Sequence, residues 1–308
     1  MKRYNLKILI VLTFYLLSFI SCQHNRTDSN NNTSPSFHVP TEGNENTLEI
    51  ATWNLKNFPE HGKSSIEYIS TIIKQLDIDI YAIQEIKNVY YFNQLVNELP
   101  EYEGLYSDDE YKSGEYQKTG IIYKKNMVSI QSKEMLFTDN TYAFPRPSML
   151  LNIKVEKQGS YFDFYLIVIH LKAYGEPENI ERRRAAAVAL KNYMDIKISD
   201  ESEHEKDYIV AGDWNDEIDD APSSNAFQIF INVPNDYKFL TMELAGDPKN
   251  ASYPLQGSLI DHILISKDCF FEYNRGKTKT LRLDDYVTKY FYYVSDHRPV
   301  MSIFPVFE

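Results

Sequence analysis

The amino-acid sequence predicts an α/β (α+β) fold in which two packed mixed β-sheets are flanked by helices. Short apolar runs of the kind that form strands recur along residues 48–304. Segments with helical periodicity separate some of these runs, whereas other runs follow one another directly, which indicates neighbouring strands with helices outside them. The folded part, of about 260 residues, is long enough to bury a substantial core as one domain.

The predicted strands are runs that are continuously apolar or that alternate apolar and polar residues. They lie at residues 48–53, 78–83, 120–123, 127–135, 149–155, 162–171, 208–211, 259–265 and 300–304. Polar residues follow several of them, beginning with Asn54. Gly212, which follows the 208–211 run, predicts a tight turn there.

Three helices are predicted between these strands. Ser64 and Glu67 have the spacing of a capping box, and the apolar residues that follow lie on one helical face. A second helix is expected at 89–99, where a proline ends it. A third is expected at 178–193, where three arginines precede an alanine-rich stretch.

Residues 1–21 are predicted to be an export signal peptide. A basic start that includes Lys2 and Arg3 precedes an apolar run at 8–20, which is short for a membrane span. The sequence around Cys22 resembles the cleavage and lipidation box of bacterial lipoproteins, which predicts a lipidated Cys22. A retained anchor and an ordinary secretory cleavage are the alternatives. We therefore expect an exported bacterial membrane lipoprotein, on the periplasmic side or at the cell surface.

Residues 22–47 are predicted to be the lipidated cysteine and a flexible tether, and residues 48–308 to be one folded domain. The tether segment is rich in Asn, Ser and Thr and has little to bury, so it cannot offset the entropy of ordering. Cys269 is the other cysteine of the chain, and its apolar surroundings predict a buried structural thiol rather than a disulfide.

The net charge of −12 argues against tight, non-specific binding of phosphate backbones, which depends on clustered Lys and Arg. The objection is partial, because acidic residues gathered at a metal site count as negative only until divalent cations bind.

Acidic, amide and histidine side chains stand repeatedly at the ends of predicted strands. Asn54, Gln84, Glu85, His170, Asp213, Asn215, Asp261 and His262 lie at the end of, or within, such runs, and Asp296 and His297 precede the last one. Their position implies one rim of the domain, where a metal and a phosphate could be held. Carboxylate and amide oxygens suit Mg²⁺, and a histidine can act as a general base near neutral pH.

The order of these motifs resembles the endonuclease/exonuclease/phosphatase superfamily, and most closely its deoxyribonuclease I-like branch. The matching motifs are Thr-Trp-Asn (52–54), Ile-Gln-Glu (83–85), Phe-Pro-Arg-Pro (144–147), Ile-His (169–170), Gly-Asp-Trp-Asn (212–215), Ile-Asp (260–261) and Ser-Asp-His-Arg-Pro-Val (295–300). The resemblance spans roughly residues 48–306 and implies the four-layer sandwich and the catalytic domain of that family.

The resemblance implies Glu85 as the main metal ligand, with Asn54 and Asp296 around it. Mg²⁺ is the expected cation, with Mn²⁺ or Ca²⁺ as alternatives. His297 is implied as the general base, with Asp261 as the carboxylate that holds its tautomer and stabilises its cation. His262, beside Asp261 on a strand, should face the opposite side and be structural.

The resemblance also implies the groups that act on the phosphate. His170 donates a proton or a hydrogen bond to the phosphate or to the leaving oxygen, and Asp213 and Asn215 orient the nucleophile and contact the phosphate. Arg146 matches a phosphate-contacting arginine. Lys87 stands where that branch has a basic groove-reading residue, with a solvated lysine as the alternative.

The sequence departs from the deoxyribonucleases at the partner of His170. Those enzymes pair the matching histidine with a glutamate, where this chain has Gln117, with Glu115 nearby. The partner of His170 is therefore open at this point.

The predicted function is exported, metal-dependent hydrolysis of DNA by attack of water on phosphorus, as in a deoxyribonuclease I-like endonuclease. The alternative is a phosphatase or phospholipase that acts on inositol phosphates or sphingomyelin on the same scaffold. We expect a nucleic acid substrate with DNA favoured, a monomer, and membrane contact only through the N-terminal lipid. The sequence leaves open DNA against RNA and endonuclease against exonuclease.

Overall fold

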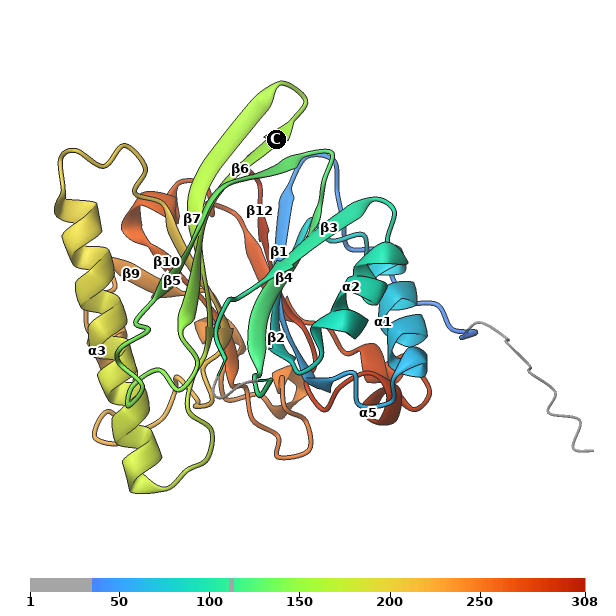
Figure 1. Ribbon diagram of the computed structural model, residues 1–308. Coiled ribbons are helices and arrows are strands. Elements are labelled where there is room, and N and C mark those ends of the chain that lie inside the picture. Colours follow the sequence, from blue (N-terminus) through green and yellow to red (C-terminus); the bar gives the residue numbers. More distant parts are fainter. Residues whose placement is uncertain (1–34, 111–113, 308) are drawn as a thin grey trace, which may run out of the picture. The chain divides into compact units, whose positions relative to one another are not determined.

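Two six-stranded mixed sheets pack face to face in the computed structural model, with helices on their outer faces (Figure 1). The predicted fold class is confirmed. The structure describes residues 35–110 and 114–307. The predicted signal peptide and Cys22 lie outside these residues. Within the described part of the chain, no helix is long and apolar enough to span a membrane.

The first sheet combines the early part of the chain with its end. Its strands, in spatial order, are β11 (Lys277–Thr280), β12 (Val300–Phe304), β1 (Leu48–Phe58), β2 (Ile80–Ile86), β4 (Lys118–Lys124) and β3 (Tyr102–Tyr106). β1 and β2 run parallel, and the other neighbours are antiparallel.

The second sheet comes from the middle of the chain. Its strands, in spatial order, are β5 (Val128–Leu136), β6 (Ser148–Lys157), β7 (Ser160–His170), β8 (Tyr208–Asp213), β10 (Asp261–Ser266) and β9 (Tyr237–Phe239). β7 and β8 are its parallel pair. Each sheet therefore contains one parallel pair whose strands end at the same edge.

Helices cover both outer faces. They are α1 (Lys63–Leu76), α2 (Val89–Asn97), α3 (Pro177–Ser199), α4 (Gln228–Ile231) and α5 (Tyr290–Tyr293), with short 3₁₀ helices η1 (Met242–Leu244), η2 (Pro248–Asn250), η3 (Lys267–Phe270) and η4 (Leu283–Asp285). Figure 1 shows α1, α2 and α5 beside the first sheet and α3 along the outside of the second.

Three apolar cores hold the layers together. Ile69 and Ile73 of α1 pack with Ile83 of the first sheet. Side chains of both sheets form the central core, and the helix α3 packs on the second sheet through Ala187 and Leu190. Each Å² of apolar surface removed from water stabilises the folded state by about 25 cal/mol. Each layer is therefore stabilised by the layer that covers its apolar face.

The start of α1 differs from the prediction. Gly62 is the N-cap and no side chain caps the helix, so Ser64 and Glu67 do not form a capping box. Instead, the hydroxyl of Ser65 accepts a hydrogen bond from the backbone N–H of His61 (3.1 Å). Gly62 has a φ of 56°, a left-handed value that glycine adopts without steric cost.

Gly212 also differs from the prediction, because it lies inside β8 and not in a turn. A Cβ atom at this position would lie 2.1 Å from the carbonyl oxygen of Ile169 on β7. The glycine therefore allows β7 and β8 to approach closely, next to the point where both strands end.

The ordered part of the domain begins before the predicted boundary at residue 48. The backbone N–H of Val39 donates to the side chain of Gln75 (2.7 Å), and the N–H of Glu42 donates to the carbonyl of Leu76 (2.8 Å). Val39 is fully buried against the core around α1. Residues 35–47 thus pack on the domain, and the prediction of a flexible tether up to residue 47 is wrong for this part because α1 offers it both apolar surface and hydrogen bonds.

Candidate active site

The two parallel strand pairs end at one rim of the sandwich, at the lower edge of the molecule in Figure 1. A cleft of about 670 Å³ opens there. Residues from both sheets line it, among them Lys56, Glu85, Arg146, His170, Lys172, Tyr174, Asp213, Asn215, Tyr253, Asp296 and His297. The rim that we predicted from the polar residues at the strand ends is therefore present, and it contains a cleft.

His297 and Asp261 form a buried pair beneath this cleft. Nδ1 of His297 lies 2.8 Å from Oδ2 of Asp261, which is fully buried at the start of β10. The His297 backbone is fixed as well, because its N–H donates to the hydroxyl of Ser295 (3.0 Å) and its carbonyl accepts from Tyr290 (2.6 Å). Nε2 is left as the ring nitrogen available to the cleft.

The acids around His297 favour its cation. Burial alone would lower the pKa of His297, but the charge and hydrogen bond of Asp261 outweigh burial and raise the pKa to about 10, with help from Asp213 and Asp296. Without a bound cation the imidazolium is therefore the stable form at neutral pH, and the ring can act as a general base only when its pKa falls toward the operating pH.

His170 lies on the other side of Asp213. The register of the second sheet places Asp213 of β8 opposite both His170 of β7 and Asp261 of β10. Nε2 of His170 lies 3.6 Å from Oδ2 of Asp213 and 3.8 Å from Oε1 of Glu85. Burial, followed by the charges of Arg146 and His297, holds the pKa of His170 well below its usual range, so this ring is neutral at pH 7.

Glu85 reaches the cleft from an irregular point of β2. It has a left-handed φ of 65°, and the register of β2 against β4 shifts between Ile83 and Ile86. Irregularities of this kind redirect a side chain at a sheet edge. Oε2 of Glu85 accepts from the backbone N–H of Asn57 (2.7 Å), and Oε1 accepts from the side chain of Asn54 (3.1 Å).

Arg146 is fixed at the cleft by neutral oxygens. Its guanidinium donates to Oε1 of Gln117 from Nε (2.9 Å) and Nη2 (2.6 Å), and from Nη1 to the carbonyl of Leu171 (3.0 Å). These bonds orient the guanidinium without neutralising its charge. They also settle the position of Gln117, which binds Arg146 and not His170.

The comparison with known proteins identifies the family. The model of the Endonuclease/Exonuclease/phosphatase family matches residues 51–297. The chain belongs to this family. Its members are hydrolases of phosphoester bonds and generally depend on a divalent metal. No curated protein sequence matches the chain significantly.

Solved structures with the same fold include enzymes of several specificities. The human Nocturnin catalytic domain with bound sulfate is 19% identical, with 85% of this chain and 95% of that chain covered and a TM-score of 0.60. A Bacteroides thetaiotaomicron mannosyl-6-phosphatase is 19% identical (83% and 98% covered, TM-score 0.56). TDP2 of D. rerio complexed with a single-strand DNA product is 17% identical (84% and 98% covered, TM-score 0.56). At these identities the similarity shows the fold of the family.

The donor set of the cleft fits the divalent cation on which the family generally depends. Burial and then the charge of Asp261 raise the pKa of Asp213 to about 7, and burial raises the pKa of Asp296. A divalent cation beside these carboxylates would restore their ionised forms. Ligand atoms of Asp213, Asp261 and His297 lie within 4.8 Å of one another and could hold a metal. His297 and Asp261 already bind each other, and the carboxylates of Glu85, Asp213 and Asp296, which line the cleft, are the further oxygen donors available to a hard cation.

Asn54 is placed differently from a metal ligand. Its amide nitrogen donates to Oδ2 of Asp213 (2.9 Å) and to Glu85, whereas its oxygen accepts from the backbone N–H of Lys56 (2.9 Å). Asn54 therefore bridges two carboxylates here. A cation between those carboxylates would require the amide to turn its oxygen inward.

Two predicted phosphate contacts have different outcomes. Asn215 lines the cleft with a left-handed φ of 58°, and its side chain donates to the carbonyl of Leu171 (3.2 Å). Lys87 is exposed and does not line the cleft. The structure therefore brings Asn215, but not Lys87, to the cleft.

His262 faces away from the cleft, as the strand alternation predicts. Its Nδ1 lies 2.8 Å from the hydroxyl of Thr241, and its Nε2 lies 3.0 Å from the carbonyl of Asp216. Burial lowers its pKa to about 4. This histidine is a neutral structural residue of the second sheet.

Several cleft residues were not predicted from the sequence. They are Lys56, Lys172, Tyr174, Arg183 and Tyr253. The ring of Tyr253 lies 5.0 Å from that of His297 and covers part of it. Arg183 carries a signal that could have identified it: it begins the buried face of α3 at the same helical spacing as Ala186, Ala187 and Leu190, where a charge needs a buried partner.

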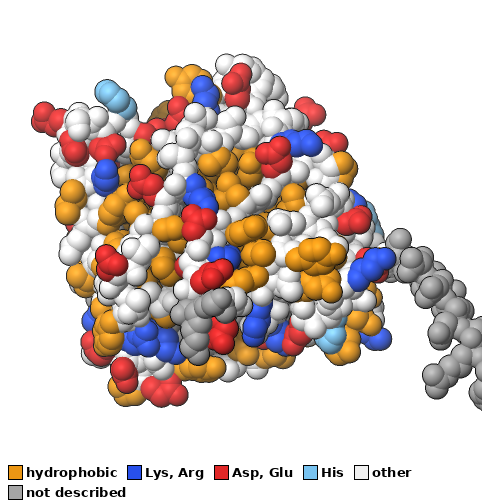
Figure 2. All heavy atoms as spheres, viewed as in Figure 1, with side chains coloured by type: hydrophobic (Ala, Val, Ile, Leu, Met, Phe, Trp, Pro, Cys, Tyr) orange, Lys and Arg blue, Asp and Glu red, His pale blue; other side chains and the backbone are white. Residues whose placement is uncertain are grey.

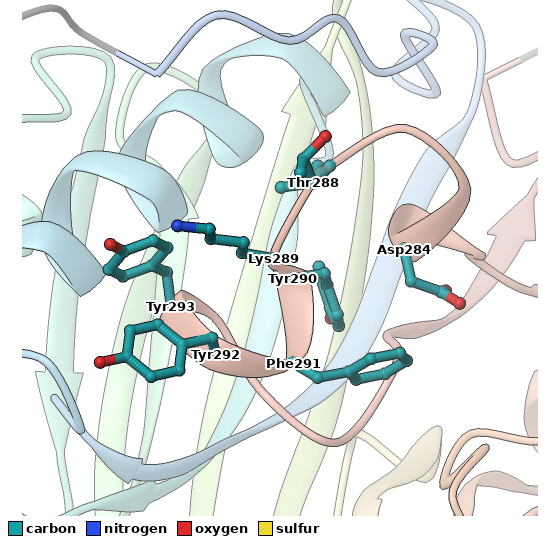
Figure 3. A pocket seen from close by; sticks show the side chains of 8 residues that line it. Asp284, Thr288, Lys289, Tyr290, Phe291, Tyr292 and Tyr293 are labelled. Atoms are coloured by element: carbon teal, nitrogen blue, oxygen red, sulfur yellow. The ribbon is translucent and has the colours of Figure 1, made fainter.

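A second hollow, of about 660 Å³, lies beside α5 and contains none of the catalytic groups (Figure 3). It is formed by η4, the loop after it and the aromatic run of α5. Tyr292 stacks on His61 with ring centres 3.9 Å apart, and Tyr293 stacks on Tyr68 at 4.6 Å. These contacts attach α5 to α1 and to the turn before it, although Phe291 and Tyr292 stay partly exposed.

Proposed function

We propose that this protein is a metal-dependent phosphodiesterase that cleaves DNA internally, in the manner of a deoxyribonuclease I-like endonuclease. The observation that carries the proposal is the convergence of the His297–Asp261 pair, His170 and three carboxylates in one cleft that also holds Arg146. Hydrolysis of a phosphodiester requires an activated water, stabilisation of the phosphate charge and support for the leaving oxygen. The cleft holds a candidate for each.

His297 is the candidate general base. In its neutral form, Nδ1–H donates to Asp261 and Nε2 accepts the proton of the attacking water. Asp213 and Asn215 border the same space and orient the water and the phosphate. Neutral His170 donates a hydrogen bond to a phosphate oxygen or to the leaving oxygen. Glu85, Asp213 and Asp296 would hold a divalent cation such as Mg²⁺, which would supply positive charge to the phosphate.

The cations of the cleft support a nucleic acid substrate. Arg146, Lys172 and Lys56 line the cleft although the whole chain has a net charge of −12. Figure 2 shows Lys and Arg side chains interspersed with Asp and Glu along the lower edge of the molecule, on the side of the rim. These cations can pair with the phosphates of a nucleic acid, beside the acidic residues Glu85, Asp213 and Asp296 of the same cleft, whose charge a bound divalent cation would offset. TDP2, with the same fold, is described with single-strand DNA.

Export and lipid anchoring remain part of the proposal. The basic and apolar start of the chain and Cys22 support a bacterial lipoprotein held at the membrane by its N-terminal lipid. Replacing Cys22 by Ser should move the protein from the membrane fraction to the soluble fraction and abolish incorporation of labelled fatty acid. Fatty acid incorporation that is unchanged in the Ser variant would exclude this anchor.

A substrate panel tests the proposed activity. Purified protein with Mg²⁺ is incubated separately with plasmid DNA, RNA, sphingomyelin and inositol phosphates, and initial rates are compared at equal enzyme. We expect DNA to be hydrolysed fastest. Faster hydrolysis of sphingomyelin or inositol phosphates would contradict the nuclease proposal and favour the phosphatase or phospholipase alternative.

A further inference from the structure

A tyrosine stands exposed at the cleft, four residues after His170. Tyr174 is 72% exposed and lines the cleft together with Lys172. The ammonium group of Lys172 lies 4.9 Å from the centre of the Tyr174 ring. A large aromatic face is thus presented to solvent beside a cation, at the edge of the catalytic groups.

Buried groups of the site hold the loop that carries Tyr174. Nη1 of Arg183 donates to the carbonyls of Lys172 and of Tyr174, both at 2.7 Å. Arg183 is 1% exposed and pairs with Asp216, whose Oδ2 lies 2.9 Å from both Nε and Nη2. These hydrogen bonds hold the backbone of the loop in place. The position of the exposed ring is therefore set by its backbone and not by packing of the ring against other side chains.

The backbone at Tyr174 supports a functional interpretation. Its φ is 78°, a left-handed value that is unfavourable for a residue with a side chain. Strained backbone maintained by buried partners is concentrated at ligand-binding positions. Other cleft residues with positive φ are Lys56, Asn57, Glu85 and Asn215.

Charge at the loop points to an anionic ligand. Arg146 and Arg183 line the same cleft as Lys172, and burial, followed by the charges of Arg182 and Arg146, lowers the pKa of Lys172 against the opposing charge of Glu176. An anion beside Lys172 would relieve this repulsion. A ligand that has both an anionic group and a flat aromatic face matches the Lys172–Tyr174 pair, and a nucleotide is such a ligand.

We propose that Lys172 and Tyr174 form a nucleotide subsite next to the scissile phosphate, in which the Tyr174 ring stacks on an unpaired base and Lys172 binds the adjoining phosphate. This inference rests on the proposed nuclease function and specifies it further. Stacking on a tyrosine needs a base face that is not covered in a duplex, so the subsite favours single-stranded or locally unwound nucleic acid. Stacking discriminates little between bases, so it adds affinity without sequence specificity.

A coupling experiment tests the stacking directly. End-labelled single-stranded oligonucleotides, intact or with one abasic position, are cleaved by wild type, Tyr174→Ala and Tyr174→Phe, and kcat/KM is measured at each bond. Base stacking on an aromatic residue changes binding by about 5- to 150-fold. For wild type, we expect kcat/KM to fall by this factor at bonds next to the abasic position, relative to the intact strand. For Tyr174→Ala, kcat/KM on the intact strand should already be lower than that of wild type by the same factor, and the abasic position should cause no further loss. Tyr174→Phe should behave as wild type.

A matched control separates the subsite from a general surface effect. Tyr161 is 66% exposed and has Lys154 over its ring at 4.3 Å, but it stands at the other end of β7. Tyr161→Ala should cleave both strands at the wild-type rate. Lys172→Ala should weaken cleavage of intact and abasic strands equally. It should also reduce the slope of log(kcat/KM) against log salt concentration by about one, as expected for the loss of one phosphate contact.

The outcomes distinguish the subsite from the function on which it rests. If an abasic position slows Tyr174→Ala as much as wild type, or if Tyr161→Ala loses as much as Tyr174→Ala, the subsite is wrong although the nuclease function stands. If wild type nicks plasmid DNA but cleaves no intact single strand, the subsite is wrong although the nuclease function stands. If it cleaves neither with Mg²⁺, Mn²⁺ or Ca²⁺, the nuclease function itself is wrong and the subsite falls with it.

Discussion

His262 of β10 and His297, in the segment before β12, are both buried but have different surroundings. His297 faces the cleft and has a pKa raised to about 10 by a carboxylate at 2.8 Å, after the opposing effect of burial. His262 is buried behind Asp261 with its pKa lowered to about 4 by burial. The comparison of the two residues therefore tests the assignment of the general base.

His297→Ala should reduce kcat by about 10²- to 10⁴-fold, the range for a positioned general base. His262→Ala should leave kcat nearly unchanged and lower the free energy of unfolding by about 1–3 kcal/mol, because it removes two buried hydrogen bonds. Steady-state kinetics and urea denaturation on variants with native circular dichroism measure both. Equal loss of kcat in the two variants would contradict the assignment.

The protonation of His297 should depend on the cation. Without metal its pKa is raised to about 10, so the ring holds its proton through neutral pH and loses it only in alkali. A cation at the nearby carboxylates reduces the negative charge that causes this shift, so the pKa should fall. NMR titration of the His297 ring protons, with and without Mg²⁺, measures the change. Titration near 6.5 in metal-free protein would contradict the electrostatic account.

At the scale of elements, the ends of β7 and β8 and the helix α3 act together through Arg183. Its guanidinium joins Asp216, after β8, to the loop after β7. Loss of one partner of a buried ion pair leaves the other charge without compensation. Arg183 should therefore be needed for the stability of the rim as well as for its geometry.

Arg183→Met should lower the free energy of unfolding by about 3–5 kcal/mol, the range for a broken buried pair. Arg183→Met combined with Asp216→Asn should be less destabilised than the sum of the two single variants, because the uncompensated charge is gone. Chemical denaturation of the four proteins measures this cycle. Simple additivity would show that the pair is not coupled.

The opposite ends of β1 and β2 contain a second electrostatic cluster, which is structural. Glu49 at the start of β1 is buried next to Asp79, and Lys157 donates to Oδ2 of Asp79 (2.8 Å). Burial, and then the charge of Asp79, raise the pKa of Glu49 from 4.5 to about 8. Folded protein therefore keeps a proton on Glu49 that the unfolded chain loses.

This difference gives stability a defined dependence on pH. Between about pH 4.5 and 8 the unfolded chain binds fewer protons at Glu49 than the folded protein, so the contribution of Glu49 to stability falls as the pH rises. Glu49→Gln should be more stable relative to wild type at pH 8 than at pH 5, by about 1–3 kcal/mol. Urea denaturation at the two pH values measures this, and an equal difference at both would contradict it.

At the scale of the whole molecule, the sequence predicted the catalytic rim better than the edges of the sheets. Asn54, Glu85, His170 and Asp213 stand at strand ends that local apolar patterns define, so their meeting at one rim followed from the strands. The edge strands β3, β9 and β11 were not predicted, because they are short and form through pairing with distant strands. The last turns of α3 were missed because propensity locates helix ends poorly.

Tertiary contacts decided the remaining differences at the site. The order of motifs fixed neither the rotation of the Asn54 amide nor the partner of Gln117, since both depend on hydrogen bonds between segments far apart in the chain. Arg183 and Tyr174 were missed for the same reason: the buried ion pair and the strained loop exist only when β7, β8 and α3 are assembled. The meeting of these side chains in one cleft was therefore predictable from the sequence, and the contacts that orient them were not.

Nicking of supercoiled plasmid DNA tests the central claim most directly, because a closed circle has no ends and only internal cleavage converts it to the open form. Wild-type protein with Mg²⁺ should produce open circles, EDTA should stop the reaction, and added Mg²⁺ should restore it. Glu85→Gln, which keeps the shape of the side chain but removes its charge, should lower the rate at least about 100-fold with unchanged circular dichroism. Undiminished nicking in EDTA or by Glu85→Gln would contradict a metal-dependent mechanism at this rim.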